Sequence, residues 1–125
     1  MNQQPDSPVN LEQLSQISEG DIEFEIEVLQ VYVEDVSQRI EKIRDAITKD
    51  DWSKIMSEAH HLKGSSANVG ALRIQTLAGQ LEKLDQAQGR EKTLEIINNT
   101  LVEIQAVELF IQEKLATLSA SSAKN

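Results

Sequence analysis

The sequence contains no cysteine, only two prolines and few aromatic residues. It can therefore form no disulfide, and it shows neither an apolar run near the ~20 residues of a membrane span nor a basic and apolar leader. We expect a cytoplasmic protein without a membrane partner. Aromatic residues make up 3% of the chain, which argues against a β-sandwich and suits helices packed by aliphatic side chains.

Basic residues are also scarce, with 12 against 21 acidic ones, so that the net charge is −9. Such a charge repels a phosphate backbone and argues against nucleic acid as a partner. A chain of 125 residues is long enough for one domain with a hydrophobic core and too short for two ordinary domains. We expect a monomer with one domain at residues 10–118, between flexible ends at residues 1–9 and 119–125.

Apolar residues recur every three or four positions, which is the period of a helix face and not of a strand. In the last helical segment Glu108 occupies a place that this period assigns to an apolar residue, and the adjacent Val107 is expected to replace it in the core. The long segments with this period span residues 22–47, 52–69, 74–84 and 94–118.

The segments between these helices are short. A short first helix is expected from Asn10 to Gly20, with Asp21 as the N-cap of the next helix. Short connections between long helices make neighbouring helices antiparallel. The sequence therefore predicts an all-α fold, an antiparallel up-down four-helix bundle with a short extra N-terminal helix. The expected separators are Lys49-Asp50-Asp51, Gly70 and Gln88-Gly89-Arg90.

The segment HHLKGSSANVG, at residues 60–70, carries the most distinctive chemistry of the chain. With about 100° between successive residues, the apolar seam of this helix leaves both His60 and His61 facing solvent. Lys63 and Gly64 lie one turn after His60, on the same side of the helix. Lys63 disfavours the imidazolium form and can pair with an approaching anion, while a neutral imidazole nitrogen is a nucleophile.

Gly64 costs roughly 1 kcal/mol relative to alanine inside a helix. An open approach to His60 for a bulky partner would explain that cost, and the small Ala67 keeps the same side clear. Three other interpretations remain open at this point. The helix could end at Gly64, the two histidines could simply be solvated surface, or they could bind a metal, although no ligand lies four residues from His60.

The run from Ala59 to Ser66 resembles the signature of the histidine-containing phosphotransfer (HPt) domain of multistep two-component phosphorelays. In that signature the phosphorylated histidine stands three residues before a Lys-Gly pair, so the resemblance implies that His60 is phosphorylated and that Lys63 and Gly64 assist. The resemblance covers about residues 10–118. Some members of the family support the ring with a glutamine from the next helix, where this chain has Glu82, and no role is carried over to Glu82.

The resemblance implies that His60 accepts a phosphoryl group from a receiver-domain phosphoaspartate, through the nitrogen we take to be Nε2, and passes it to another receiver aspartate. The expected partners are response-regulator receiver domains, including those of a hybrid histidine kinase. The sequence has no phosphate-binding glycine loop and no acidic cluster typical of a Mg²⁺ site. We therefore expect a phosphocarrier without its own ATP site or cofactor, with Mg²⁺ on the partner receiver.

A second apolar stripe, formed by Phe24, Val28 and Val31, lies away from the main seam of the second helix. It could bind a receiver or be buried fully by the first helix. Two competing functions also remain open, a binding module that does not transfer phosphate and a phosphatase acting on receiver phosphoaspartate. The candidate receiver docking surface consists of Phe24, Val28, Val31, Met56, Ser57 and Ala67.

Overall fold

The computed structural model describes residues 7–84 and 89–123, and every regular element in these two stretches is a helix. The predicted all-α fold is confirmed. In the described part of the chain the predicted helices recur with bounds shifted by a few residues. They are α1 (Leu11–Ser18), α2 (Ile22–Thr48), α3 (Trp52–Val69), α4 (Leu72–Glu82) and α5 (Gly89–Ala123).

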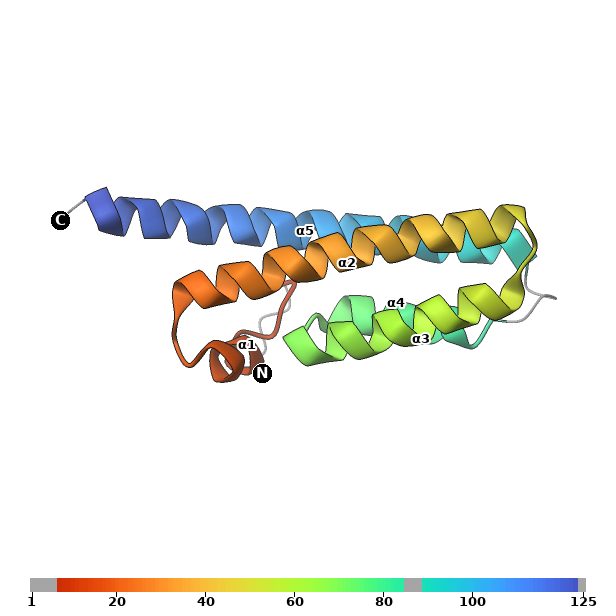
Figure 1. The fold of residues 1–125 in the computed structure, drawn as a ribbon, viewed down its shortest axis with the longest axis horizontal. Helices are drawn as coiled ribbons and strands as arrows, with labels where there is room; N and C mark the ends of the chain where they lie inside the picture. Colours follow the sequence, from red (N-terminus) through yellow and green to blue (C-terminus); the bar gives the residue numbers. More distant parts are fainter. Residues whose placement is uncertain (1–6, 85–88, 124–125) are drawn as a thin grey trace.

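The four long helices run up and down as an antiparallel bundle (Figure 1). The helices α2 and α5 form the longer pair, and α3 and α4 form a shorter pair that packs against it. The connection from α2 to α3 needs only residues 49–51, and the connection from α3 to α4 only residues 70–71. Because these connections are so short, each helix turns back along its predecessor.

Side-chain caps fix where three of the helices begin. Asn10 and Asp21 accept hydrogen bonds from the backbone N–H groups of Gln13 and Phe24 at the starts of α1 and α2. Asp51 does the same for the N–H of Lys54 at the start of α3. The helix α3 ends at Gly70, whose φ of 79° lies in the left-handed region that favours glycine. The predicted cap at Asp21 and the predicted stop at Gly70 are confirmed.

The apolar seams meet in one continuous core. Most seam positions are buried, but Ile22 and Leu94, at or near the starts of α2 and α5, are 38% and 39% exposed. Val107 is fully buried and Glu108 is exposed, so the prediction that Val107 replaces Glu108 in the core is confirmed. The largest fully buried side chains are Leu14, Leu29, Ile40, Ile43, Ile55, Leu62, Ile74, Ile96 and Ile97.

The short helix α1 is attached to the C-terminal end of α3. The backbone N–H of Asn10 donates to the carbonyl of Gly70 at 2.7 Å, and the side chain of Gln13 donates to the carbonyl of Ala67. A Cβ on Gly70 would lie 3.1 Å from the Asn10 Cβ, so glycine also permits this close approach. The helix that carries both histidines is therefore held at its end by α1.

Ordered structure extends past the expected bounds at both ends, through a buried residue at one end and a longer helix at the other. Val9, inside the segment expected to be flexible, is 1% exposed and belongs to the core. At the other end α5 continues to Ala123, past the expected end at residue 118. Alanine and serine in this stretch are compatible with helix, and no glycine or proline follows Gly89 to stop it. Residues 1–6, 124–125 and the expected turn residue Gln88 lie outside the described residues.

Within residues 7–84 and 89–123, no helix is both long enough and apolar enough to span a bilayer.

Candidate functional site

The outer side of α3 presents both histidines to solvent, as predicted. The side chain of His60 is 67% exposed, and His61 is also exposed. The two ring centroids lie 6.2 Å apart in an edge-on arrangement. Within the part of the chain that the structure describes, His60 alone of the two histidines has a polar partner from another helix, and that partner distinguishes the two imidazoles.

The partner is Glu82, the last residue of α4. Its Oε2 lies 2.8 Å from Nδ1 of His60, and its Oε1 lies 2.6 Å from Nζ of Lys63. A single carboxylate thus binds the imidazole and the ammonium group that the sequence had placed one turn apart. The sequence reasoning gave Glu82 no role, and the structure brings it into direct contact with both site residues.

The carboxylate of Glu82 determines which nitrogen of His60 carries the proton. Hydrogen bonds from Lys63 and then from His60 hold the pKa of Glu82 below its usual value, so the group is ionised at neutral pH. An ionised carboxylate can only accept hydrogen bonds, so Nδ1 of a neutral His60 must be the donor. The lone pair then resides on Nε2, the nitrogen that can act as a nucleophile.

Gly64 lies inside a continuous helix, because α3 runs from Trp52 to Val69. The alternative that the helix ends at Gly64 is therefore wrong. Among residues 7–84 and 89–123, no atom from outside its own helix would lie within 4 Å of a Cβ built on Gly64. The absence of a side chain therefore serves no internal packing need, and it leaves the surface one turn after His60 open.

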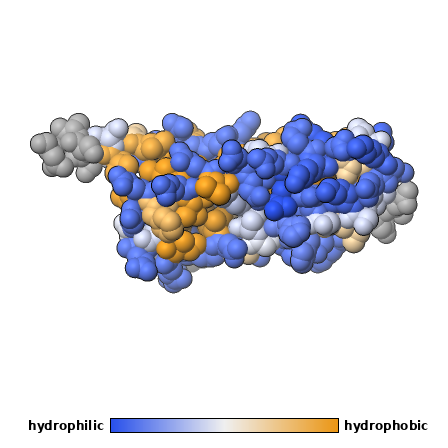
Figure 2. Space-filling view, in the orientation of Figure 1, coloured by the Kyte–Doolittle hydropathy of each residue, from blue (hydrophilic) through white to orange (hydrophobic). Residues whose placement is uncertain are grey.

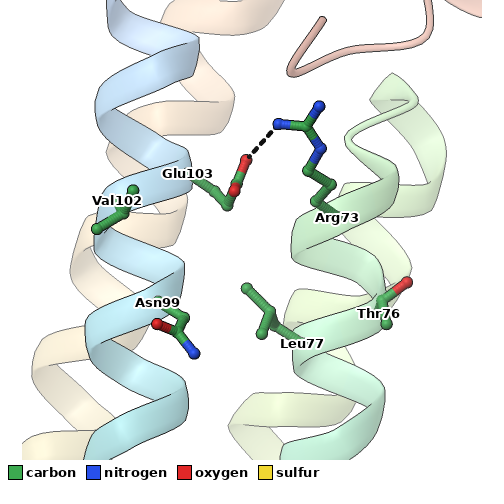
Figure 3. A pocket seen from close by; sticks show the side chains of 6 residues that line it. All are labelled: Arg73, Thr76, Leu77, Asn99, Val102 and Glu103. Atoms are coloured by element: carbon green, nitrogen blue, oxygen red, sulfur yellow. Dashed lines mark hydrogen bonds and ion pairs between the residues drawn. The ribbon is translucent and has the colours of Figure 1, made fainter. Parts of the chain in front are cut away.

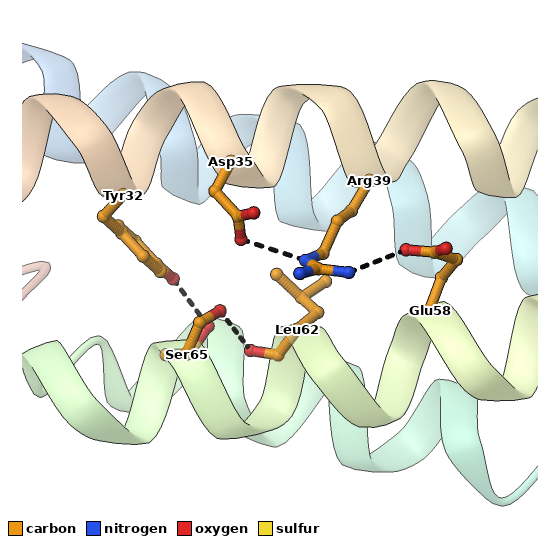
Figure 4. Close-up of polar contacts among 7 residues, drawn as sticks. Tyr32, Asp35, Arg39, Glu58, Leu62 and Ser65 are labelled. Carbon is orange, nitrogen blue, oxygen red and sulfur yellow. Dashed lines mark hydrogen bonds and ion pairs between the residues drawn. The ribbon is translucent and has the colours of Figure 1, made fainter.

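On the side of α3 that faces away from His60, polar contacts join α3 to α2 (Figure 4). The buried hydroxyl groups of Tyr32 and Ser66 lie 2.6 Å apart, and Arg39 donates to Glu58 at 2.9 Å. Lys54 also pairs with Glu58, which is only 6% exposed. Burial alone would raise the pKa of Glu58, but its hydrogen bonds from Arg39 and Lys54 outweigh that effect and lower it. The Tyr32 hydroxyl is held neutral, because burial raises its pKa.

A groove of about 520 Å³ separates α2 from the outer part of α3, and we call it the α2–α3 groove. Phe24, Val28 and Val31 line one wall, and Ser65 and Asn68 line part of the other. Figure 2 shows apolar surface gathered over the half of this face that carries α1 and the N-terminal half of α2. Phe24 is 43% exposed and Val31 is 68% exposed. The alternative that α1 buries the whole stripe is therefore wrong.

The remaining residues of the candidate docking surface lie outside the α2–α3 groove. Met56 and Ser57 are exposed one turn before His60, and Ala67 is partly buried two turns after it. They share α3 with His60 but do not line the groove. The candidate surface is thus an apolar groove on α2 together with separate positions along α3.

A second depression, of about 390 Å³, lies between α4 and α5 (Figure 3). An ion pair between Arg73 and Glu103 closes one end, and Leu77 and Val102 contribute apolar surface. None of the residues around His60 lines it. Across residues 7–84 and 89–123, no three histidine, cysteine or acidic side chains come together as a metal would require.

Comparison with known families agrees with this geometry. The model of the family described as "Hpt domain" matches residues 27–120, which is most of the chain. The chain belongs to the Hpt domain family. Two solved structures share the fold of this Hpt domain at 23% sequence identity. One, with a TM-score of 0.69, is histidine-containing phosphotransfer protein B from Pseudomonas aeruginosa PAO1 and covers 87% of this chain and 96% of its own.

The other is the HPT domain of an Hpt sensor hybrid histidine kinase from Shewanella, with a TM-score of 0.67 and coverage of 91% and 98%. Among curated proteins, the Hpt domain is 29% identical over 98 residues to "Histidine-containing phosphotransfer protein 2" of Arabidopsis thaliana, spanning 76% of this chain and 63% of that protein. It is 28% identical over 65 residues to "Phosphorelay intermediate protein rdeA" of Dictyostelium discoideum, spanning 52% and 26%. The chain thus spans less than two thirds of the length of these relatives.

Proposed function

We propose that this Hpt domain carries a phosphoryl group on His60 between receiver domains of a two-component phosphorelay. The observation that carries the proposal is the bond from Nδ1 of His60 to Glu82, because it leaves Nε2 as the free nucleophile. Lys63 lies at the same carboxylate, and Gly64 leaves the approach open. The names of its relatives, among them a phosphorelay intermediate, support the same role.

In the proposed reaction the lone pair of Nε2 attacks the phosphorus of a receiver phosphoaspartate. The new P–N bond forms as the P–O bond breaks, and the electron pair of that bond stays on the aspartate oxygen. The ring keeps its Nδ1 proton and becomes a phosphoimidazolium. Such transfers depend mainly on positioning and on charge stabilisation, and Lys63 is the cation available for the phosphoryl oxygens. The reverse steps pass the group to another receiver.

We further propose that this domain uses no ATP and no cofactor of its own, and that the Mg²⁺ of the reaction belongs to the receiver. The sequence offers no phosphate-binding glycine loop, which supports the first part. The receiver would dock over the outer side of α3 and the α2–α3 groove. The apolar side chains of Phe24 and Val31 would lie at the centre of this docking surface. The working compartment would be the cytoplasm, and the working state a monomer.

The test is transfer of labelled phosphoryl groups from a panel of phosphorylated receivers to the chain and to a His60→Gln variant. The proposal predicts an acid-labile, base-stable label on the native chain and none on the variant. Loss of label from the receivers, with none on the chain, would instead identify a phosphatase. Receivers that bind and keep their label would identify a binding module. Either of the last two results would overturn the proposed function.

A further inference from the structure

Glu82 serves two hydrogen-bond donors at once, one with each carboxylate oxygen. Oε2 accepts from His60 and Oε1 accepts from Lys63, and the Glu82 side chain is 25% exposed. A glutamine in this place has only one acceptor oxygen, and its NH₂ group would face the second donor. The two contacts together therefore require a carboxylate, and its charge distinguishes this site from one that only orients the ring.

Three titratable groups face the His60 ring in the described structure. Glu82 reaches it from α4, Lys63 lies beside it on α3, and the His61 ring is its neighbour along the helix. Glu82 is the only anion among them and the only one hydrogen-bonded to the ring. Its charge therefore stabilises a positive charge on the imidazole, and the ammonium group of Lys63 opposes that effect.

We propose that Glu82 keeps the Nδ1 proton on phosphorylated His60, so that the phosphohistidine remains in the form that can donate its phosphoryl group. This inference rests on the proposed function. When the P–N bond breaks, its electron pair returns to Nε2. A ring that carries the Nδ1 proton leaves as neutral imidazole, whereas a ring without it would have to leave as the far more basic imidazolate. Glu82 acts here as a positioning residue and not as a base.

In the phosphorylated state Lys63 can pair with the phosphoryl group in place of Glu82. The phosphoryl group brings up to two negative charges to Nε2 of His60, and the flexible ammonium group of Lys63 can turn towards them. Glu82 then has the imidazolium as its remaining partner, which strengthens its effect on the Nδ1 proton. The same three side chains thus suit both states, with Lys63 bound to Glu82 before transfer and turned towards the phosphoryl group after it.

The test measures the pH at which phosphorylated His60 loses its Nδ1 proton, by two-bond ¹H–¹⁵N NMR. Both the parent chain and a Glu82→Gln variant carry His61→Gln, so that a single imidazole remains. Each chain is phosphorylated by a labelled receiver found active in the panel, or by phosphoramidate where the receiver transfer is slow. We expect the parent to hold its proton to a pH about 1 unit or more above that of the variant. Lys63→Met should shift the midpoint upwards, because it removes the opposing charge.

Glu103→Gln is the matched control, because it neutralises a carboxylate of similar exposure in an interhelical ion pair with Arg73, away from His60. It should leave the midpoint unchanged. Equal midpoints for the parent and Glu82→Gln chains, both phosphorylated on His60, would overturn this inference and leave the proposed function standing. If no receiver and no chemical donor phosphorylates His60 in any of the chains, the proposed function falls, and the inference falls with it.

Discussion

Gly64 lies in the middle of α3, and no described atom from outside this helix lies within 4 Å of the position that its Cβ would take. Replacing it with alanine should therefore stabilise the fold, by about 0.5 to 1 kcal/mol, because alanine is the better helix former. The same methyl group would narrow the approach to His60 and slow transfer from a receiver. Denaturant unfolding and a transfer time course measure the two effects.

Asn98→Ala, at an exposed position of α5, is the control for Gly64→Ala. It should give a smaller gain in stability and an unchanged transfer rate. A Gly64→Ala chain that transfers at the native rate would show that the missing side chain is not needed for access, and the functional reading of Gly64 would be lost.

The site residues differ in how far the sequence could predict them. Helical spacing alone placed His60, Lys63 and Gly64 on one side of a helix, and the structure agrees. It could not predict the contact with Glu82, because the two partners lie 22 positions apart and meet only through the packing of α3 on α4. The sequence does show an acidic residue, Glu82, at the end of the helix that follows α3. Which side of α4 this residue faces depends on how α4 packs against α3, and the sequence alone does not give that.

The contact between α2 and α3 includes a carboxylate, that of Glu58, which the fold keeps ionised. Arg39 and Lys54 lower the pKa of Glu58 in the folded chain below its ordinary value of 4.5. The unfolded chain therefore binds a proton at Glu58 first as the pH falls. The stabilisation of the fold by ionised Glu58 is fully present above pH 4.5 and is lost as the pH falls through the pKa of Glu58 in the folded chain. The free energy of unfolding should therefore decrease with acidification below about pH 4.5.

Arg39→Met tests this pairing directly. It should lower the free energy of unfolding at pH 7 by about 1 to 3 kcal/mol, because a buried carboxylate loses a charged hydrogen-bond donor. Arg39→Met should also weaken the decrease in the free energy of unfolding on acidification. Arg44→Met, which removes only an exposed pair with Glu41, should cost about 0 to 1 kcal/mol. Urea unfolding at pH 7 and pH 3.5 measures both variants, and equal losses of unfolding free energy would contradict a stabilising role of the Arg39–Glu58 ion pair.

Helix positions followed from the sequence more closely than helix ends. The spacing of apolar residues predicted the buried faces of α2 and α3, and the caps at Asp21 and Gly70 follow from local hydrogen bonding. The apolar period fades after residue 118 and predicts the end of α5 there, whereas the helix continues to Ala123. Alanine and serine continue a helix without such a period, so composition there says little about where it stops.

The bundle as a whole presents two different faces to a partner. One face carries the α2–α3 groove, which is lined by exposed apolar residues of α2 and by residues of α3, the helix of His60. The other face carries the depression between α4 and α5, which Val102 lines. Val31 and Val102 are 68% and 61% exposed, so a glutamate at either position should leave the unfolding midpoint nearly unchanged. Val31→Glu should slow transfer from receivers by weakening their binding, and Val102→Glu should not.

Transfer rates measured over a range of receiver concentrations separate binding from chemistry in this pair. A high receiver concentration should restore the transfer rate of Val31→Glu. Equal rates for both variants and the native chain would remove the α2–α3 groove from the docking surface. The sequence could indicate the stripe but not its exposure, because whether α1 covered it depended on how α1 attaches to the end of α3.

We expect Glu82 to hold Nδ1 of His60 and so to leave Nε2 to carry the phosphoryl group. Phosphorylating the native chain from a receiver and recording its ¹H–¹⁵N and ³¹P spectra identifies the phosphorylated atom directly. His61→Gln should show the same signals, and His60→Gln should show none. We expect the phosphoryl group on Nε2 of His60, and a phosphoryl group on Nδ1 of that ring or on His61 would show that Glu82 does not direct the reaction in this way.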